Sequence, residues 1–529
     1  MDVLAGTGAI VRLVVVRDRW RLLAWVGAVV ALVAITAWST KGLYATQEDL
    51  DLAAAAARDN PAALAFNGPD QALDTMGGQI AFQVGAFGLT LVGLMSVLLV
   101  GRLTRAEEDS GRLELIRSMP VGRGAPLAAA LGVVGVAQLL AAAGSAASLV
   151  LLDQEVHGSI VFGMGFLGVG WLWIGVTALS AQVAENPRVV TGAAGGALGV
   201  AYVVRAAGDM SGGGLSWLSP IGWAQKARPF AGETWLPLLL LFAATVALVA
   251  AAVVVARRRD FRAGLVAPRP GPARAAPHLR SPLALATRLH RTAIAWWAGA
   301  TWLLGLVYGS LAESVEDFIG DNEAVAEILA SLQGVSLVDS YLATSLLITA
   351  LIAVGPALQV MGRMRAEEAD LRAEPLLATQ VSRPRWMASH VAFALGGTAL
   401  TVVLGGFGLG LGHSLVGGGA GQVAEMTVDA VVYLPALLVL AGIPVLLFGV
   451  APRWTFAGWL GLAGAFVIAM FGELLDLPQL VVDLSPVQHV PPVPASEVRA
   501  LPFVVLSALA VALFVGGFAA FRRRDLAPS

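Results

Sequence analysis

Two charged segments recur in this chain 260 residues apart, and they hold the side chains best suited to specific chemistry. The first island, Arg105–Arg123, reads RAEEDSGRLELIRSMPVGR, and the second island, Arg365–Arg383, reads RAEEADLRAEPLLATQVSR. Eight of the nineteen aligned positions are identical, where composition alone would give roughly two, which indicates an internal repeat. Arginines and carboxylates in this arrangement can form ion pairs. Because each island lies between long apolar runs, we expect a partner in the aqueous phase.

Residues for other kinds of chemistry are absent. The sequence has no G-x-x-x-x-G-K-[ST] segment, and neither lysine lies in a glycine-rich loop, so no ATP site of the Walker type is predicted. The six histidines form no H-E-x-x-H pair, no G-x-S-x-G motif occurs, and the lack of cysteine excludes disulfides and thiolate metal sites. We therefore expect no catalytic, metal or cofactor site in this chain, and no nucleic-acid partner.

The elements that position the islands are predicted membrane spans. The chain is 57% hydrophobic and 13% charged, with a mean hydropathy of +0.76, whereas soluble domains carry about 25% charged residues. Twelve segments approach the roughly 20 apolar residues that a membrane-crossing helix needs, and backbone pairing within each segment favours helices. The sequence therefore predicts an all-α integral membrane protein with twelve transmembrane helices. The predicted spans are Leu23–Ser39, Ile80–Val100, Ala125–Leu151, Ile160–Ser180, Val189–Ala207, Leu236–Val255, Ala293–Leu311, Leu342–Met361, Met387–Leu411, Ala430–Val450, Thr455–Phe471 and Leu501–Ala520.

Basic residues predict the orientation of these spans. If the N-terminus is cytoplasmic, 28 of the 34 Arg and Lys residues lie on the inner side, while the outer segment 312–339 carries acidic charges only. Lys and Arg accumulate in cytoplasmic loops. We therefore expect a multi-pass protein of the bacterial inner membrane with both termini in the cytoplasm.

Further repeats indicate two pseudo-symmetric halves. RRRD occurs at Arg257–Asp260 and again at Arg522–Asp525, and Leu-Ser-Pro occurs at Leu218–Pro220 and Leu484–Pro486. Six spans per half keep the same orientation, as in transporters built from parallel repeats. The predicted parts are a first six-span half at 1–262, a Pro-rich cytosolic linker at 263–284 and a second six-span half at 285–529.

Ionisable groups are nearly absent from the spans, which contain no Asp, Glu or Lys and a single Arg, Arg205. Ion-coupled transporters need such groups at membrane depth. Asp153 and Glu473 lie at outer span ends, where we favour interfacial carboxylates over a proton relay, and Arg205 is expected to snorkel or to pair locally. Energy for transport is therefore expected to enter through the islands.

The islands can be a docking surface or only a solvated loop. A helix over Glu107–Ser118 would place Leu113 and Ile116 on one face and pair Glu108 with Arg112. A loop would explain the arginines by the positive-inside rule. It would not explain glutamates at identical offsets in both islands, because acidic residues contribute little to topology. We therefore favour docking.

At these residues the sequence resembles a known family. The RAEE…E island after the second span of each half resembles the coupling helix in the membrane subunits of six-span ABC-type exporters. The segments Ala184–Arg188 (AENPR) and Leu215–Trp235 are similar to a fused twelve-span actinobacterial subgroup, usually described as polyketide antibiotic exporters of the tetronasin-resistance type. The second island departs from the first, because Pro375 stands at the position of Leu115 and predicts a helix that breaks or starts anew there.

The resemblance implies two copies of a separate ATPase subunit, one on each island, which would bind ATP and Mg²⁺. It also implies outward export of hydrophobic or amphipathic compounds, from the cytoplasm or the inner leaflet, through a cleft between the halves in contact with membrane lipids. The docking residues it implies are Arg105, Glu107, Glu108, Arg112, Glu114, Arg117 and Arg123 in the first island and Arg365, Glu367, Glu368, Arg372, Glu374 and Arg383 in the second.

A cleft for such cargo should be lined by aromatic and uncharged polar side chains. The same side chains also form interhelical hydrogen bonds and packing contacts, which we favour. Trp217 and Trp223 indicate first an aromatic belt at the outer interface and second an outer gate. The candidates within spans are Phe82, Gln83, Phe87, Gln138 and Gln359.

Together these features predict the transmembrane subunit of an ATP-driven exporter for drug or antibiotic efflux. An exporter of an envelope lipid or glycolipid fits the sequence equally well. An ion-coupled secondary antiporter is disfavoured by the nearly uncharged spans, and a scaffold or sensor is disfavoured by the two pseudo-symmetric halves.

Overall fold

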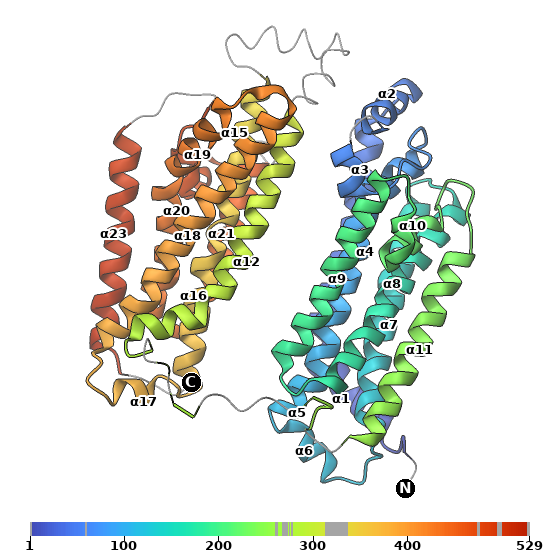
Figure 1. The fold of residues 1–529 in the computed structure, drawn as a ribbon, viewed down its shortest axis with the longest axis horizontal. Coiled ribbons are helices and arrows are strands. Elements are labelled where there is room, and N and C mark those ends of the chain that lie inside the picture. The colour runs from blue at the N-terminus through green and yellow to red at the C-terminus, as the bar shows by residue number, and fades with distance from the viewer. Residues whose placement is uncertain are drawn as a thin grey trace. The chain divides into compact units, whose positions relative to one another are not determined.

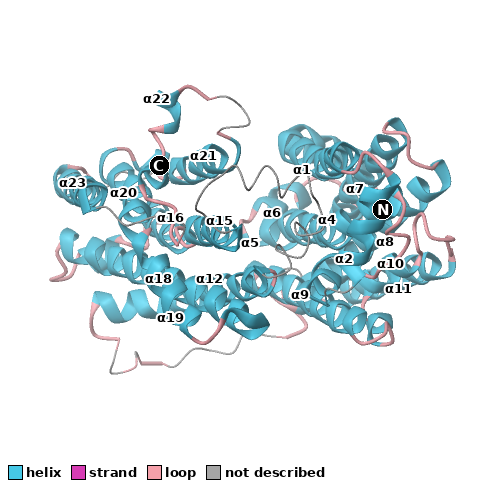
Figure 2. Cartoon of the chain, turned by 90° about the horizontal axis from the view of Figure 1, so that it is seen from above, coloured by secondary structure: helices cyan, strands magenta, loops and turns pink. Residues whose placement is uncertain are grey.

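The computed structural model describes residues 3–58, 61–259, 263–266, 273, 274, 276, 279–312, 337–472, 477–494 and 500–525. Within these ranges the chain is helical, and its only extended pairing is a single bridge between Ala184 and Val266 (Figures 1 and 2). The chain divides into two compact units, Met1–Gly271 (unit 1) and Pro272–Ser529 (unit 2). The prediction of an all-helical membrane protein is confirmed at this level.

Unit 1 is a bundle of six long helices with short helices at both ends. In Figure 1, α2, α3 and α10 lie at one end of this bundle and α5 and α6 at the other. The central helices α4 and α8 are the most buried, whereas α1 and α11 expose most of their surface. The long helices are α1 (Thr7–Leu43), α4 (Met76–Gly101), α7 (Ala125–Leu151), α8 (Val156–Val183), α9 (Pro187–Met210) and α11 (Leu236–Arg258). The short ones are α2 (Gln47–Arg58), α3 (Pro61–Asn67), η1 (Arg102–Ala106), α5 (Glu107–Asp109), α6 (Arg112–Arg117), η2 (Leu215–Leu218) and α10 (Pro220–Lys226).

Unit 2 is a second helical bundle, in which α12 packs along α18 and α20 packs along α23. Its long helices are α12 (Pro282–Ser310), α15 (Leu337–Ile352), α16 (Gly355–Ala369), α18 (Arg383–His413), α19 (Gly421–Val432), α20 (Leu434–Val450), α21 (Ala457–Phe471) and α23 (Ala500–Arg523). The short helices are α17 (Glu374–Leu377), η3 (Ser414–Gly418), η4 (Pro452–Trp454), α22 (Gln479–Val482) and η5 (Pro486–His489).

The predicted number of twelve spans is not reached. Among the described residues, ten helices are long and apolar enough to cross a membrane, or eleven if α19 and α20, which bend by 42°, form one span. The remaining predicted span, Ala293–Leu311, lies in α12, which is not one of these helices. Tryptophan, glycine and threonine interrupt the apolar part of α12 and lower its hydropathy.

Two predicted spans are interrupted at prolines. The span expected at Leu342–Met361 divides into α15 and α16, and Pro356 is the second residue of α16. The span expected at Ala430–Val450 is bent between α19 and α20, and Pro435 is the second residue of α20. Proline lacks a backbone N–H and its ring clashes with the preceding turn, so a helix is interrupted before it.

Each unit has its own hydrophobic core. In unit 1 the core centres on Phe166 and Trp173 of α8, and Gly88 of α4 lies so close to the Phe166 ring that an added Cβ would collide with it. In unit 2 the core contains Tyr433, beside α20, and Phe448 of α20. Burial of apolar surface within each unit therefore stabilises it by itself.

The first residues of the predicted linker are ordered. Leu265 N–H donates to the Gln182 carbonyl (3.2 Å) and Val266 N–H to the Val183 carbonyl (3.1 Å), so 263–266 pair with the end of α8. At the other end, α12 begins at Pro282, two residues before the predicted linker ends. Most of the acidic outer segment, and Glu473, lie outside the described residues.

Candidate functional site at the two charged islands

Neither island is a continuous helix, so the helix predicted over Glu107–Ser118 is wrong. In the first island α5 ends at Asp109, Gly111 has a φ of 74°, and α6 begins at Arg112. In the second, α16 ends at Ala369, Leu371 has a φ of 59°, and α17 begins at Glu374. Gly111 and Leu371 occupy the same repeat position. The left-handed backbone there ends the first helical piece, and the two islands share this conformation.

Pro375 has the effect that the sequence predicts. It is the second residue of α17, a position where the missing N–H of proline costs no hydrogen bond, so a new helix starts at Glu374. The prediction that the second island starts a new helix here is confirmed. Because the first island is broken as well, the break does not distinguish the two islands.

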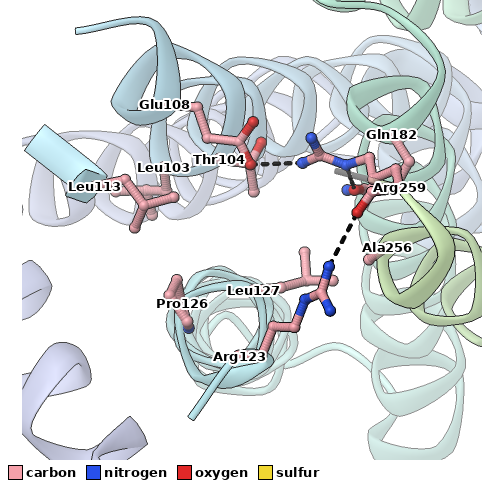
Figure 3. Close-up of a pocket in the computed structure, with 10 residues that line it drawn as sticks. All are labelled: Leu103, Thr104, Glu108, Leu113, Arg123, Pro126, Leu127, Gln182, Ala256 and Arg259. Carbon is pink, nitrogen blue, oxygen red and sulfur yellow. Dashed lines mark hydrogen bonds and ion pairs between the residues drawn. The ribbon is translucent and has the colours of Figure 1, made fainter. Parts of the chain in front are cut away.

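The buried carboxylate of Glu108 is the centre of an ion-pair cluster in unit 1. It accepts from Arg105, one turn earlier. It also accepts from Arg259, the residue that follows α11 (Figure 3). Arg259 also donates from Nε to Gln182 Oε1 at the end of α8 (2.6 Å). The carbonyl of Arg259 accepts from Arg123 Nη2 (3.2 Å), just before α7. We call Glu108, Arg123 and Arg259 the first clamp.

Unit 2 contains the same arrangement. Glu368 is 4% exposed and accepts from both Nη1 (2.7 Å) and Nη2 (2.9 Å) of Arg524, the residue after α23. The carbonyl of Arg524 accepts from Arg383 Nη1 (2.7 Å) at the start of α18. The Arg524 guanidinium lies 5.4 Å from the ring centroids of Phe448 and Phe521. Glu368, Arg383 and Arg524 form the second clamp.

The two clamps join equivalent elements. In each unit, the carboxylate comes from the island, one arginine comes from the start of the next long helix, and the other follows the unit's last helix. The last-helix arginine of each clamp also contacts another helix of the bundle, through a hydrogen bond to α8 in unit 1 and through the Phe448 ring of α20 in unit 2. The repeated glutamates therefore have a structural partner inside their own unit.

Sequence reasoning missed Arg259 and Arg524 as members of the site. The signal was present, because each is the third arginine of the repeated RRRD segment. The two arginines are 265 positions apart and the islands 260, so an ungapped comparison of the islands does not connect them.

The other glutamates pair differently in the two islands. Glu107 Oε1 lies 3.0 Å from Arg17 Nη2 of α1 and 3.8 Å from Arg112 Nη1. The expected pair of Glu108 with Arg112 is therefore wrong, because the break at Gly111 turns Arg112 toward Glu107. In the second island Glu367 pairs with Arg372 (3.3 Å). Arg112 and Arg372 thus have equivalent partners, and Glu107 additionally joins its island to α1.

The predicted docking residues divide by exposure. Arg105, Glu107, Glu108 and Glu368 are buried, and Arg365, Glu367 and Arg383 are partly buried. Leu113 is buried, and Ile116 is partly buried against a hydrophobic core cluster of unit 1. The side chain of Arg117 lies outside the described residues. The exposed side chains are Arg112, Glu114, Leu115, Met119 and Arg123 in the first island and Arg372, Glu374 and Pro375 in the second.

The AENPR segment also contributes to this end of unit 1. Asn186 Oδ1 caps α9 by accepting from Arg188 N–H (2.9 Å), and Pro187 is its first residue. The Glu185 carbonyl accepts from Arg105 Nε (2.7 Å). The segment that sharpened the family resemblance is therefore in direct contact with the first island.

Comparison with known proteins shows the family of the chain. The chain is 38% identical over 524 residues to the multidrug efflux system permease protein Rv1217c of Mycobacterium tuberculosis (strain ATCC 25618 / H37Rv), covering 98% of this chain and 95% of that protein. It belongs to the family of multidrug efflux system permeases. A family model described as the C-terminal domain of the multidrug efflux system permease Rv1217c matches residues 279–522. The chain is thus a transporter component and a multi-pass membrane protein, whereas its tetronasin-type subgroup stays a prediction.

The predicted cargo residues of the permease lie in different environments. Gln138 is buried, and its Nε2 donates to the Val92 carbonyl (2.8 Å) and to Ser96 Oγ (2.7 Å), which is the packing role we favoured. Phe82 is also buried, and Gln83 Oε1 accepts from Thr40 Oγ1 (3.0 Å).

Two of the cargo candidates are exposed on the surface of their unit. Phe87 of α4 is 41% exposed and lies against Phe66 at a ring-centroid distance of 4.9 Å. Gln359 of α16 is exposed and accepts from Trp297 Nε1 (2.6 Å). Both residues lie in the second predicted span of their half.

The predicted outer gate is a well-anchored segment. Trp223 Nε1 donates to the Trp217 carbonyl (2.6 Å), and Ser219 Oγ donates to the Ala201 carbonyl of α9 (2.6 Å). Ser219 is also the N-cap of α10. The Leu-Ser-Pro repeat recurs in unit 2, where buried Ser485 immediately precedes η5 but makes no capping hydrogen bond through its side chain.

Asp153 and Asp209, near ends of long helices of unit 1, each pair with a basic residue. Lys41 Nζ lies 2.7 Å from Asp153 Oδ2 and holds the pKa of this exposed carboxyl below its usual range. A group that stays ionised at neutral pH is a poor proton relay, which agrees with an interfacial carboxylate. Arg205 pairs locally, with Asp209 Oδ2 at 3.3 Å, as expected.

A buried histidine pair was not expected. His290 of α12 and His390 of α18 approach to 2.9 Å between Nε2 and Nδ1, and Trp386 packs edge-on to His390. His390 lies within the predicted span Met387–Leu411, so this span contains a titratable side chain. Among the described residues, no group of three or more metal-binding side chains comes together.

Proposed function

We propose that this permease is the membrane-spanning subunit of an ATP-driven exporter, in which one separate ATPase subunit docks on each island and binds ATP and Mg²⁺. The observation that carries this proposal is the repetition of the island in both units: the same break, the same buried clamp and an exposed charged face beside it. Two equivalent surfaces fit two copies of one partner.

The exposed residues next to the break are the contact surface in this proposal. Arg112 and Glu114 in the first island, and Arg372 and Glu374 in the second, offer charged groups to a partner. Leu115 is 73% exposed, so it can offer an apolar contact beside these charges. The buried glutamates are left out of this contact surface.

We further propose that the cargo is hydrophobic or amphipathic. The relative Rv1217c is named a multidrug efflux system permease, and Phe87 and Gln359 offer aromatic and polar groups on exposed faces of the two units. A glutamine on a surface that faces lipid would be costly, so Gln359 favours a polar surrounding. In this proposal α12 is the twelfth span, both termini are cytoplasmic, and the membrane is the bacterial inner membrane.

Purification of the permease from its native membrane tests this proposal. We expect an ATP-hydrolysing subunit to co-purify, and ATP hydrolysis to rise when hydrophobic compounds are added. The permease alone should bind no nucleotide. Nucleotide binding by the isolated chain without a co-purifying ATPase would contradict the proposal, and stimulation by envelope lipids instead of drugs would identify a lipid exporter.

A further inference from the structure

We propose that Glu108 and Glu368 are positioning residues that join each island to the last helix of its unit. This inference rests on the proposed function, because it describes how movement of a docked ATPase would pass into the bundle. It changes the role of two residues: the repeated glutamates do not contact the partner but transmit its movement to α11 and α23.

Burial is the first observation behind this inference. Glu108 and Glu368 are 8% and 4% exposed, and each carboxylate forms an ion pair with an arginine of its own unit. A partner protein could bind these carboxylates only by displacing Arg259 or Arg524. Arg112 and Glu114 have exposed side chains on the same island.

The geometry of the second clamp is the next observation. Arg524 donates through both terminal nitrogens to Glu368, at 2.7 and 2.9 Å, and this paired arrangement fixes orientation as well as distance. The Arg524 backbone is held too, because its carbonyl accepts from Arg383. The end of α23 therefore has to follow the island when the island moves.

Repetition of the clamps is the third observation. A contact that only stabilised a loop could use different partners in the two units, as Glu107 does when it also reaches Arg17 of α1. The clamps instead join the island to the same element, the end of the last helix, in both units. In unit 1 Arg259 also donates a hydrogen bond to Gln182 of α8. Movement of the first island would therefore pass to two helices, α11 and α8.

Unit 2 offers the clearer test, because Glu368 and Arg524 form the ion pair of the second clamp without the additional Arg105 contact of unit 1. The chain contains no cysteine, so two spin labels can be placed without removing any residue. Exposed Ala378, after α17, and exposed Arg523, at the end of α23, are suitable sites, as Ala378→Cys and Arg523→Cys. The distance between the labels is measured by pulsed electron paramagnetic resonance. The sample is the full permease with its ATPase in lipid nanodiscs, with and without a non-hydrolysable ATP analogue.

In the otherwise unchanged chain we expect one narrow distance distribution in both nucleotide states. Glu368→Gln should broaden it, while the ATPase stays attached and still hydrolyses ATP. Transport of ethidium per ATP hydrolysed, measured in proteoliposomes, should fall roughly 2- to 30-fold, the range seen for residues on coupling paths. The charge swap Glu368→Arg with Arg524→Glu should restore a narrow distribution and part of the transport. The contact-surface variant Glu374→Gln should instead weaken ATPase attachment.

Other outcomes would overturn the inference. Loss of ATPase attachment in Glu368→Gln with an unchanged label distance would make Glu368 a docking residue and leave the proposed function standing. If Glu368→Gln lowered ethidium transport and ATP hydrolysis by the same factor, the second clamp would only stabilise the fold. If no ATPase attaches to the unchanged permease, the proposed function itself fails, whatever the label distances are.

Discussion

At the scale of single residues, the charged side chains of this permease serve mainly its own structure. Glu108 and Glu368 hold helix ends together, and Arg205 is completely buried toward the C-terminal end of α9. Arg205 pairs with Asp209, and its guanidinium lies 4.5 Å from the Tyr202 ring centroid. Charges in this apolar bundle are retained where each has a partner, since an unpaired buried charge is costly.

The Arg205–Asp209 pair gives the first prediction. Arg205→Met should destabilise unit 1 by about 3–5 kcal/mol, because it leaves the Asp209 carboxylate buried without its cation. The double variant Arg205→Met with Asp209→Leu should recover much of the loss, since neither charge remains. Thermal unfolding of the purified permease in detergent measures both. Equal destabilisation by the two variants would contradict this account.

Leu371 gives the second prediction. Its φ of 59° costs a branched side chain roughly 1–2 kcal/mol, and its repeat counterpart is Gly111 with a φ of 74°. Leu371→Gly should therefore stabilise unit 2 by about 1 kcal/mol or less. The gain is limited because glycine loses more conformational entropy on folding than leucine does. Leu371→Ala removes the same exposed side chain but keeps the strain, so it is the matched control and should bring no gain in unfolding temperature.

At the scale of elements, the islands are folded turns with an inner and an outer face. The break at Gly111 and at Leu371 turns the glutamates inward, toward the helix ends, and leaves α6 and α17 at the surface. Reversing Glu107 and Glu108 to Arg would therefore place cations against Arg17 and Arg259. Such a double variant would destabilise the fold as well as impair transport, so surface residues make better tests of docking.

Leu115 gives the third prediction. If an ATPase covers it, Leu115→Asp should weaken attachment roughly 10- to 100-fold, since burying a leucine side chain contributes about 1.5–3 kcal/mol. Pro375→Asp, at the matching position, should have a smaller effect because proline offers less apolar surface. Leu480 is 82% exposed outside the islands, so Leu480→Asp is the control. Attachment is measured by co-purification, and equal losses from Leu115→Asp and Leu480→Asp would exclude a specific contact.

The two islands also remain distinguishable as elements. Glu107 of the first island reaches Arg17 of a different helix, α1, whereas Glu367 of the second pairs with Arg372 and with Arg363 of its own helix, α16. We therefore still expect Glu114→Ala and Glu374→Ala to reduce ATP-coupled transport by different factors. The reason has changed, because both islands are broken and the difference lies in how each is attached to its bundle.

At the scale of the whole molecule, the permease consists of two units that each enclose their own apolar core. All core clusters among the described residues lie within one unit or the other. The division falls between Gly271 and Pro272, inside the predicted linker. Each unit therefore has an apolar core of its own, and the origin of the two units by duplication and fusion of a six-span half stays a prediction.

This division gives the fourth prediction. Residues 1–271 and 272–529, produced as separate chains in one cell, should both insert into the membrane and co-purify through a tag on either chain. Efflux of ethidium should be recovered at least in part, because no core cluster of the described residues is cut. Unit 1 alone should give no efflux. Failure of either unit to insert without the other would show that the cores depend on each other.

The sequence by itself determined the membrane class, the two islands, the repeated segments that frame them and the new helix start at Pro375. These are properties of composition and of local backbone chemistry, which need no knowledge of distant contacts. The sequence also indicated that Arg205 would pair locally, since Asp209 is one helical turn away.

Only the tertiary structure decided which charged residues pair with each other and which face of each span is buried. Glu108 and Arg259 are 151 positions apart, and Glu368 and Arg524 are 156 apart, so no local pattern could connect them. The helices α4, which contains Phe87, and α7, which contains Gln138, are apolar on all sides. The periodicity of the sequence therefore could not show that Gln138 is buried and Phe87 exposed. The packing of neighbouring helices determines which residues are buried. It also brings the repeated charged residues of each unit together with their partners in the two clamps.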